Sequence, residues 1–261
     1  MTGIVESIGG GAISAMSSFR STIFAAAVTI FKAFNKEICN SASFSVLISQ
    51  IYFTAVEILP MFIAISVLLG TLVMGILFQT IKEIGLDQHL GRILVGFAVT
   101  ELSPFVTVLL LALRSSSAIN TEIAVMKVNR EIDTLTAFRI DADRYLFIPR
   151  IVNGMISLVL LNGLFSIILV TSGLIFSKLI FGMGLATYSQ ILAGSVHLSD
   201  SIILVAKCLT FGFFITLIPI LSGLRATYDV TTIPVSVLHG MIRVFLAIIL
   251  IEVLSLVARF I

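Results

Sequence analysis

Charge is scarce in this 261-residue chain: Lys, Arg, Asp and Glu make up 11% of it, against roughly 25% in an average soluble protein. Lys178 is the only charged residue between Arg150 and Asp200, and the tract from Ile151 to Ser177 contains none. A helix that crosses a bilayer needs about 20 apolar residues, whereas a surface helix of a soluble protein must show a polar face. With 58% hydrophobic residues and a mean hydropathy of +1.16, the sequence predicts an integral membrane protein.

Several catalytic motifs are also missing. The chain has no G-x-S-x-G, which an intramembrane serine hydrolase, the main alternative class, would need. It has no H-E-x-x-H, and His89, His197 and His239 lie in three separate loops or span ends, so we expect no metal site. A G-x-x-x-x-G-K-[ST] loop is absent as well. We therefore expect no catalytic residue and no cofactor in this chain, and we expect ATP-Mg to be bound by a partner.

Cysteine and tryptophan are rare. Cys39 and Cys208 lack metal-ligand spacing and are expected to be small apolar packing residues. The absence of tryptophan leaves tyrosine and phenylalanine as anchors at the membrane interface. The formal net charge of +2 gives no reason to expect nucleic acid as a partner.

Five apolar segments are long enough to cross a membrane. We expect an all-α integral membrane protein with a single five-span domain over residues 49–261. The segment Leu179–Ser199 is apolar but rich in small residues, and is expected to form a loop or short helices on one membrane face. The spans are expected at about Tyr52–Thr80, Ile93–Met126, Ile151–Phe176, Ser201–Leu224 and Val235–Ala258.

Residues 1–48 follow a different pattern. Apolar residues from Phe19 to Phe34 recur at three- and four-residue steps, with Arg20, Lys32 and Lys36 between them. The uncharged stretch there is too short to span a bilayer. It favours an amphipathic helix lying in the membrane interface, and a packed helix without a membrane role is the alternative.

The distribution of Lys and Arg indicates the orientation, because cytoplasmic flanks are richer in both. With a cytoplasmic N-terminus, the far side holds four of these residues: Lys82, Arg92, Lys178 and Arg259. The cytoplasmic side then holds nine, which favours a cytoplasmic N-terminus and a periplasmic C-terminus: Arg20, Lys32, Lys36, Lys127, Arg130, Arg139, Arg144, Arg150 and Arg225.

The segment 127–150 joins the second and third spans and carries five basic and four acidic residues. Ile132, Leu135 and Phe138 recur at three-residue steps, which predicts a short amphipathic helix suited to a groove on a soluble subunit. An ordinary surface helix is the alternative. Asp141 or Asp143 is expected to cap a following turn, and Pro149 suits the entry to the third span.

Charged residues inside spans are costly and are usually paired or face water. Glu101, Arg114, Glu122, Lys207, Arg243 and Glu252 lie in or beside spans. Arg114 and Glu122 are about 12 Å apart along a helix, too far for a direct pair, so we expect them to bind neighbouring segments. Pro104 and Pro219 are expected to loosen the second and fourth spans by removing a backbone donor.

Several motifs follow one another in fixed order, and the chain resembles the MlaE/YrbE family, the permease subunits of MCE-associated lipid ABC transporters. The likeness covers about residues 45–261. The motifs are Glu101-Leu102-Ser103-Pro104, Leu113-Arg114-Ser115-Ser116-Ser117-Ala118-Ile119, Thr121-Glu122-Ile123, Met126-Lys127, Glu131-Ile132-Asp133 and Asp143-Arg144-Tyr145-Leu146-x-x-Pro149-Arg150.

The resemblance implies a homodimer in the bacterial inner membrane that moves phospholipids to or from a periplasmic ring of MCE-domain proteins. Two copies of a cytoplasmic ABC ATPase would drive it, and a small STAS-domain subunit is a further partner that the resemblance allows. The segment 127–140 would be the coupling helix, with Glu131 and Asp133 as polar contacts and Leu135 and Phe138 as apolar ones. Arg114, Glu122, Arg144 and Arg150 would form a structural charge network.

Glu101 and Lys207 are predicted to face the lipid-binding cavity, with Lys207 attracting the headgroup phosphate. Position 100, where the family often has arginine, is Thr100 here, so a substrate contact at this position would be polar and not charged. Two alternatives stay open: a membrane scaffold that only anchors an ATPase, and a transporter of another hydrophobic substrate such as a sterol or fatty acid.

Overall fold

The computed structural model describes residues 58–86 and 89–260, and every regular element within these ranges is a helix. Five helical stretches are long and apolar enough to cross a membrane, which confirms the predicted all-α membrane fold. The elements are α3 (Leu59–Ile84), α4 (Leu90–Ile93), η4 (Leu94–Leu102), α5 (Ser103–Leu111), η5 (Ala112–Ser116), α6 (Ser117–Val128), α7 (Glu131–Ala137), η6 (Asp143–Phe147), α8 (Ile148–Phe181), α9 (Leu185–Ala193), α10 (Leu198–Gly223) and α11 (Thr232–Phe260).

The second and third spans are longer than predicted. Helix begins at Leu90 and at Asp143, ahead of the predicted starts near Ile93 and Ile151, and α8 continues to Phe181. The element α9 lies between α8 and α10, where loops or short helices were expected. The interfacial helix predicted in residues 1–48 and the start of the first span lie outside the described residues.

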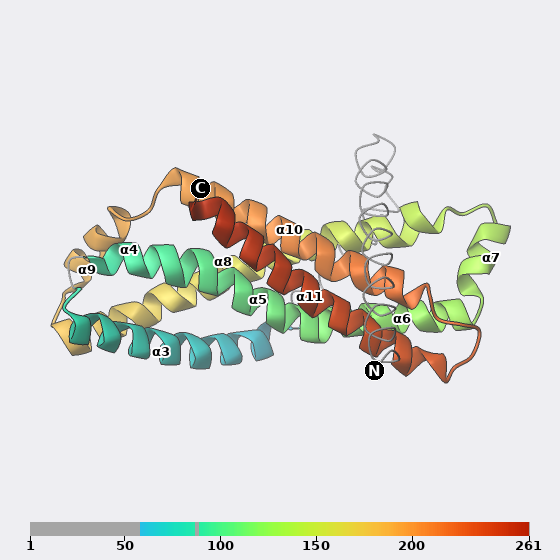
Figure 1. Ribbon diagram of the computed structural model, residues 1–261, viewed down its shortest axis with the longest axis horizontal. Coiled ribbons are helices and arrows are strands. Elements are labelled where there is room, and N and C mark those ends of the chain that lie inside the picture. The colour runs from blue at the N-terminus through green and yellow to red at the C-terminus, as the bar shows by residue number, and fades with distance from the viewer. Residues whose placement is uncertain (1–57, 87–88, 261) are drawn as a thin grey trace, which may run out of the picture.

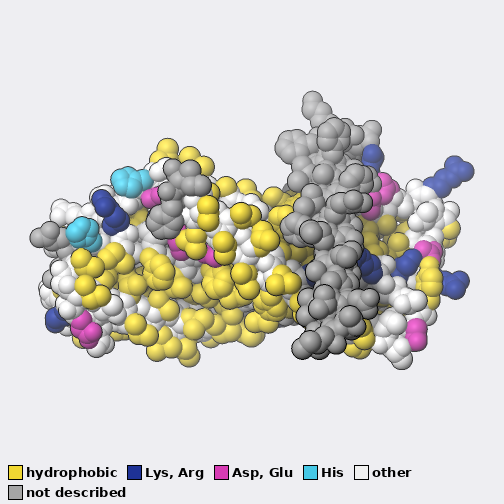
Figure 2. Space-filling view, in the orientation of Figure 1, with side chains coloured by type: hydrophobic (Ala, Val, Ile, Leu, Met, Phe, Trp, Pro, Cys, Tyr) yellow, Lys and Arg dark blue, Asp and Glu magenta, His cyan; other side chains and the backbone are white. Residues whose placement is uncertain are grey.

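The long helices run side by side along one direction (Figure 1). At one end lie α7 and the loop from α10 to α11; at the other lie the turn from α3 to α4 and the helix α9. Figure 2 shows hydrophobic side chains over the middle of the molecule, with Lys, Arg, Asp and Glu mostly towards its two ends. This is the distribution that a bilayer around the middle would require.

The helix α3 illustrates how the bundle divides core from lipid. Its buried residues, from Phe62 to Ile81, recur every three or four positions and form one stripe facing α8. Phe62 meets Phe165 of α8 edge to face, with ring centroids 6.3 Å apart. Leu72 and Ile76 are apolar but exposed, so the opposite face also suits hydrocarbon and not water.

The helices α8 and α10 approach closely at a pair of glycines. A Cβ atom on Gly212 would lie 2.6 Å from the Cα atom of Met155 and 2.8 Å from the carbonyl oxygen of Gly154. Both are backbone atoms that cannot move aside. Small residues at such crossings let helix backbones pack directly in a membrane, so these two positions set the distance between the central helices.

Prolines inside the spans are accommodated in two ways. Pro104 follows the nine-residue π-helical segment η4, and Pro149 follows η6, so in both places the helix widens its turn just before the proline. The predicted loosening at Pro104 is therefore confirmed. Pro149 was expected at the start of the third span, but the helical stretch begins six residues earlier, because η6 runs directly into α8.

Pro219 differs, because α10 continues through it as an α-helix. A proline cannot donate to the carbonyl four residues earlier, which here belongs to Ile215. The hydroxyl of Ser116 donates a hydrogen bond to that carbonyl at 2.6 Å, across from the second span. Ser116 is buried, so it replaces the missing backbone donor in a place that water does not reach.

Replacing Ser116 with alanine is expected to lower the free energy of unfolding by about 1–3 kcal/mol, because a buried carbonyl loses its donor. Thermal unfolding in detergent measures the loss. Ser117→Ala is the matched control, since that hydroxyl is exposed and bonds only its own helix. In a Pro219→Ala background the Ser116→Ala loss should shrink, because the alanine N–H takes over the carbonyl; an undiminished loss would contradict this assignment.

Candidate functional site

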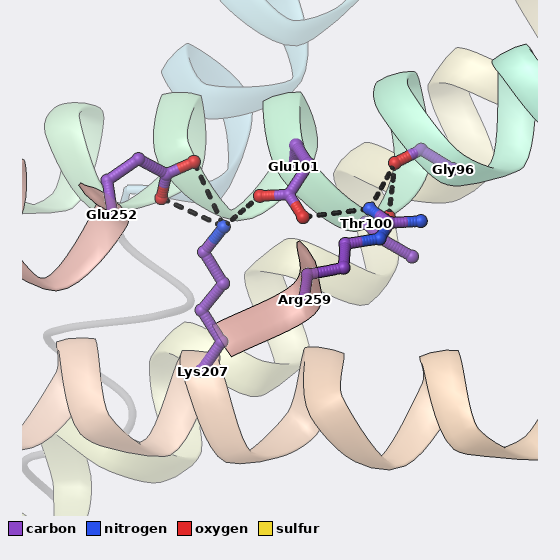
Figure 3. A network of polar contacts seen from close by, with 6 residues as sticks. All are labelled: Gly96, Thr100, Glu101, Lys207, Glu252 and Arg259. Carbon is purple, nitrogen blue, oxygen red and sulfur yellow. Dashed lines mark hydrogen bonds and ion pairs between the residues drawn. The ribbon is translucent and has the colours of Figure 1, made fainter. Parts of the chain in front are cut away.

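Lys207 lies at the centre of a buried ion cluster (Figure 3). Its ammonium nitrogen is 2.5 Å from Oε2 of Glu101 and 2.9 Å from both carboxylate oxygens of Glu252. The lysine side chain is 2% exposed, so nearly all of its charge is balanced by these two carboxylates rather than by water. A buried charge in such a place needs partners of opposite sign.

Arg259 completes the cluster. Its Nη1 donates to Oε1 of Glu101 at 2.8 Å, to the Thr100 hydroxyl at 2.9 Å and to the Gly96 carbonyl at 2.7 Å. Two carboxylates therefore meet two cations, and the formal charges cancel. Figure 3 shows the Lys207 ammonium between the two glutamates, with the Arg259 guanidinium on the other side of Glu101.

Three helical stretches bring these side chains to one depth. Glu101 lies in η4, Lys207 in α10 and Glu252 in α11. At a rise of about 1.5 Å per residue, each lies about 12–17 Å from the end of its helical stretch on the α9 side. The cluster is thus well inside the bundle, away from the end that carries α7.

The helix α7 has no buried residue, and the Phe138 side chain that follows it is 74% exposed. Both flanking residues, Arg130 and Arg139, have φ of 59° in the left-handed region, which fixes sharp turns at each end of this short helix. Ile132 and Leu135 are partly exposed on it. The predicted short helix is confirmed. Ile132 packs against the buried cluster that includes Ile123 and Phe147, whereas Phe138 is available to a partner.

A tyrosine from another loop fixes the start of α7. The Tyr228 hydroxyl donates to Oδ2 of Asp133 at 3.2 Å, and Lys127 Nζ lies 3.2 Å from the same hydroxyl and 3.4 Å from Oδ1 of Asp133. Lys127 and Arg130 each lie 5.0 Å from the centre of the Tyr228 ring. The segment 127–150 and the α10–α11 loop are therefore joined by a network of polar and cation–π contacts.

Asp229, beside this tyrosine, stabilises the same loop. The Thr231 N–H donates to its Oδ1 at 3.1 Å, and this hydrogen bond lowers the pKa of the Asp229 carboxyl. Asp141 acts in the same way in the segment 127–150, because its Oδ1 accepts the Asp143 N–H at 3.0 Å. The cap expected from Asp141 or Asp143 is therefore made by Asp141.

The family described as Permease MlaE matches residues 47–258, most of the chain. The chain belongs to the MlaE permease family. This confirms the resemblance on which the sequence-based interpretation relied.

Related proteins fall into the same group. The chain is 26% identical over 182 residues to the intermembrane phospholipid transport system permease protein MlaE of Haemophilus influenzae, covering 69% of each chain. It is 29% identical over 143 residues to a probable ABC transporter permease of Synechocystis, covering 55% of this chain and 54% of that one. It is 27% identical over 176 residues to the chloroplastic protein TRIGALACTOSYLDIACYLGLYCEROL 1 of Arabidopsis thaliana, covering 64% of this chain and 49% of that one. The chain thus spans about half the length of the last two relatives.

The predicted substrate residues of this MlaE-family chain come together, but as an ion cluster. Thr100, Glu101 and Lys207 are neighbours, and all three are buried. Within the described chain the Lys207 ammonium faces carboxylates, so a direct contact with a lipid phosphate stays a prediction. Such a contact would require the lysine to exchange a carboxylate for the phosphate.

Sequence reasoning did not assign Glu252 and Arg259 to this site. Glu252 was noted as a charge inside a span but without a partner, and Arg259 was counted only as a flanking basic residue. A signal was present, since the two are seven residues apart and so share one face of α11. Lys207 alone inside α10 needed a carboxylate, and Glu252 was one of few available.

Some of the residues predicted to form a structural charge network do form ion pairs. Arg150 Nη2 lies 2.7 Å from Oε1 of Glu122, which ties the start of α8 to α6. Arg144 Nε lies 3.7 Å from Oδ2 of Asp141, within the segment 127–150. Arg114 lies in η5, on the same continuous stretch as Glu122. Glu131 is exposed at the first position of α7, and Asn129 donates to it at 3.3 Å.

Proposed function

We propose that this chain is the membrane permease subunit of an ABC transporter that moves phospholipids between the bacterial inner membrane and a periplasmic MCE-domain protein. Its N-terminus is cytoplasmic and its C-terminus periplasmic. It works as a homodimer on two copies of a separate ATPase that binds ATP-Mg. A STAS-domain subunit is an optional further partner.

The exposed helix α7 is the observation that carries this proposal. No residue of α7 is buried and Phe138, directly after it, is 74% exposed, so although Ile132 packs against the bundle, the outer surface of this short helix fits a groove on a soluble subunit. Membership of the MlaE family and the phospholipid transport named for the Haemophilus relative support lipid as the substrate. A chain that only anchored an ATPase would have no use for a buried four-charge cluster, which is costly within a membrane.

The cluster suggests how a charged headgroup is handled. In the resting state Lys207 is neutralised by Glu101 and Glu252. A lipid phosphate that reaches the cluster competes with these carboxylates for the ammonium. When the lipid leaves, the carboxylates return, so the lysine is never left uncompensated in the membrane. Binding at such a site is reversible, as transport requires.

Replacing Phe138 with aspartate is expected to abolish co-purification of the ATPase, because the aromatic anchor of the interface becomes a charge. The fold should be unaffected, since this side chain is 74% exposed. The measurement is affinity purification of the complex from its native host, with photo-cross-linking from positions 135 and 138.

Thr136→Asp is the matched control. Thr136 lies two residues earlier, about 200° around the helix axis, and its hydroxyl bonds only the Ile132 carbonyl of its own helix. It should leave the complex intact. Capture of no nucleotide-hydrolysing subunit from either cross-linking position would refute the proposed transport function.

A further inference from the structure

A cavity of about 680 Å³ lies at the end of the bundle opposite α7. It is formed by the start of α4, the helix α9, the start of α10 and the end of α11. With a cytoplasmic N-terminus this end faces the periplasm. The cavity lies beside the buried ion cluster, because Arg259 and Gly96 belong to both.

The side chains that line this cavity are mainly polar and basic. Arg92 and Arg259 contribute two positive charges and Asp200 one negative charge. The charge of Arg259 is already balanced within the ion cluster, so this residue offers an anion its unused N–H donors, and Arg92 offers both charge and donors. Ile191 is the only large aliphatic residue among them. A lining of this kind does not suit an acyl chain, and it does suit a small hydrophilic anion.

The histidines strengthen this character. His89 and His197 lie far apart in the sequence and were expected in separate loops, but both line this cavity. Each immediately precedes a helix, and His197 comes directly before α10, which begins without a side-chain cap. The free N–H groups at the start of α10 add donors next to the basic side chains.

Arg259 has donors to spare for a ligand. A guanidinium carries five N–H groups, and the bonds to Glu101, Thr100 and Gly96 all come from Nη1. Arg92 makes no ion pair with any described residue. Two guanidinium groups thus line one small cavity with donors that the rest of the described chain does not use.

We propose that this cavity binds a phosphate group, with Arg92 and Arg259 as its principal ligands. Planar guanidinium groups match the geometry of phosphate oxygens and bind them through paired hydrogen bonds. The inference rests on the proposed function in one respect: the phosphate is that of a lipid headgroup at the periplasmic end of the transport path. The acyl chains remain outside the cavity, along the apolar surface of the bundle.

This assignment links the cavity to the buried cluster. An anion bound to the free donors of Arg259 shares that guanidinium with Glu101 and weakens their ion pair. The negative charge of Glu101 is then compensated more by Lys207 and less by Arg259. An anion in the cavity at one end of the bundle therefore changes the ion pairing of Lys207, which lies deeper in the membrane, through the shared side chain of Arg259.

The test is ligand binding to the purified permease in detergent, without ATPase or ATP. The probes are dihexanoyl phosphatidylglycerol, inorganic phosphate and dihexanoylglycerol, which lacks phosphate. Arg92→Gln is expected to weaken binding of the phosphatidylglycerol on the order of tenfold or more, because one bidentate contact is lost. Arg92→Lys keeps the charge but loses the fork geometry, so its affinity for the phosphatidylglycerol should lie between those of the unaltered protein and Arg92→Gln.

Lys82→Gln is the matched control, since Lys82 lies at the same end but donates to the Ile180 carbonyl outside the cavity. It should bind like the unaltered protein. Tighter binding of the phosphatidylglycerol than of inorganic phosphate identifies a headgroup site, and equal binding of the two, both lost in Arg92→Gln, identifies a site for free phosphate.

Three results would overturn the inference: unchanged binding in Arg92→Gln, equally tight binding of dihexanoylglycerol, or an effect of Arg92→Gln only on capture of a periplasmic protein. These results are distinct from failure of the proposed function. If ATP-driven lipid transfer persists without phosphate binding, only the proposed phosphate site in the cavity is refuted. If phosphate binds but no ATP-driven lipid transfer occurs, the proposed transport function is refuted and the anion site stands.

Discussion

Replacing Lys207 with methionine is expected to stop lipid transport and to lower the free energy of unfolding by about 3–5 kcal/mol, the usual cost of removing one partner from a buried ion pair. Glu101 and Glu252 would then share a buried site with only Arg259 to balance them, leaving a formal charge of −1. Transport into acceptor vesicles and thermal unfolding in detergent measure the two effects separately.

A second substitution separates the structural role of Lys207 from its proposed role in transport. Adding Glu252→Gln to Lys207→Met returns the cluster to neutrality and keeps the ion pair between Arg259 and Glu101. Most of the lost stability should return, while transport should stay at least about tenfold slower, equivalent to 1.4 kcal/mol or more of lost interaction with the substrate. Normal transport by the double variant would show that Lys207 only holds the helices together.

Glu122→Gln provides a comparison for this series. It breaks a different interhelical ion pair, the one with Arg150, but the Glu122 side chain is 53% exposed. Solvent screens such a pair, so the loss of stability should be clearly smaller than for Lys207→Met. An equal loss of unfolding free energy in Glu122→Gln and Lys207→Met would mean that burial does not determine how much the cluster contributes to stability.

Replacing Tyr228 with alanine is expected to uncouple ATP hydrolysis from transport without releasing the ATPase. The substitution removes the contacts that hold the α10–α11 loop against the start of α7. Two cation–π contacts and two hydrogen bonds to charged groups are lost, so the lipid moved per ATP should fall on the order of tenfold. The measurement is the ratio of lipid transfer to phosphate release in vesicles.

Tyr228→Phe and Tyr145→Ala are the matched variants. The phenylalanine keeps the ring beneath Lys127 and Arg130 but loses the hydroxyl, so its ratio should lie between those of the unaltered protein and the alanine variant. Tyr145 is an exposed tyrosine in the segment 127–150, and its loss should leave the ratio unchanged. An unaltered ratio in Tyr228→Ala would exclude a role for this loop in coupling.

The sequence was informative about features that depend on composition and local pattern. Five spans, a short amphipathic helix between the second and third, and a disturbed helix before Pro104 all follow from charge scarcity, periodicity and proline chemistry. The start of the third span was placed too late, because a π-helical segment ahead of Pro149 cannot be recognised from residue types alone.

Pairing across helices was the harder problem. The sequence showed that Lys207 and Glu101 need partners, but the choice among carboxylates depends on the rotation and depth of each helix, which follow from packing. Arg259 shows the difficulty well. It was counted as a flanking charge, yet its long side chain reaches Gly96 and Thr100 in another helix. Likewise, nothing local in the sequence places Tyr228 beside Asp133.

The balanced composition of the Lys207 cluster has an electrical consequence. Moving one elementary charge through a membrane potential of 100 mV involves about 2.3 kcal/mol. Two carboxylates and two cations that shift together carry no net charge, so the voltage across the membrane neither assists nor opposes their displacement. Any dependence of the proposed transport on membrane voltage would then report the charge of the lipid headgroup itself.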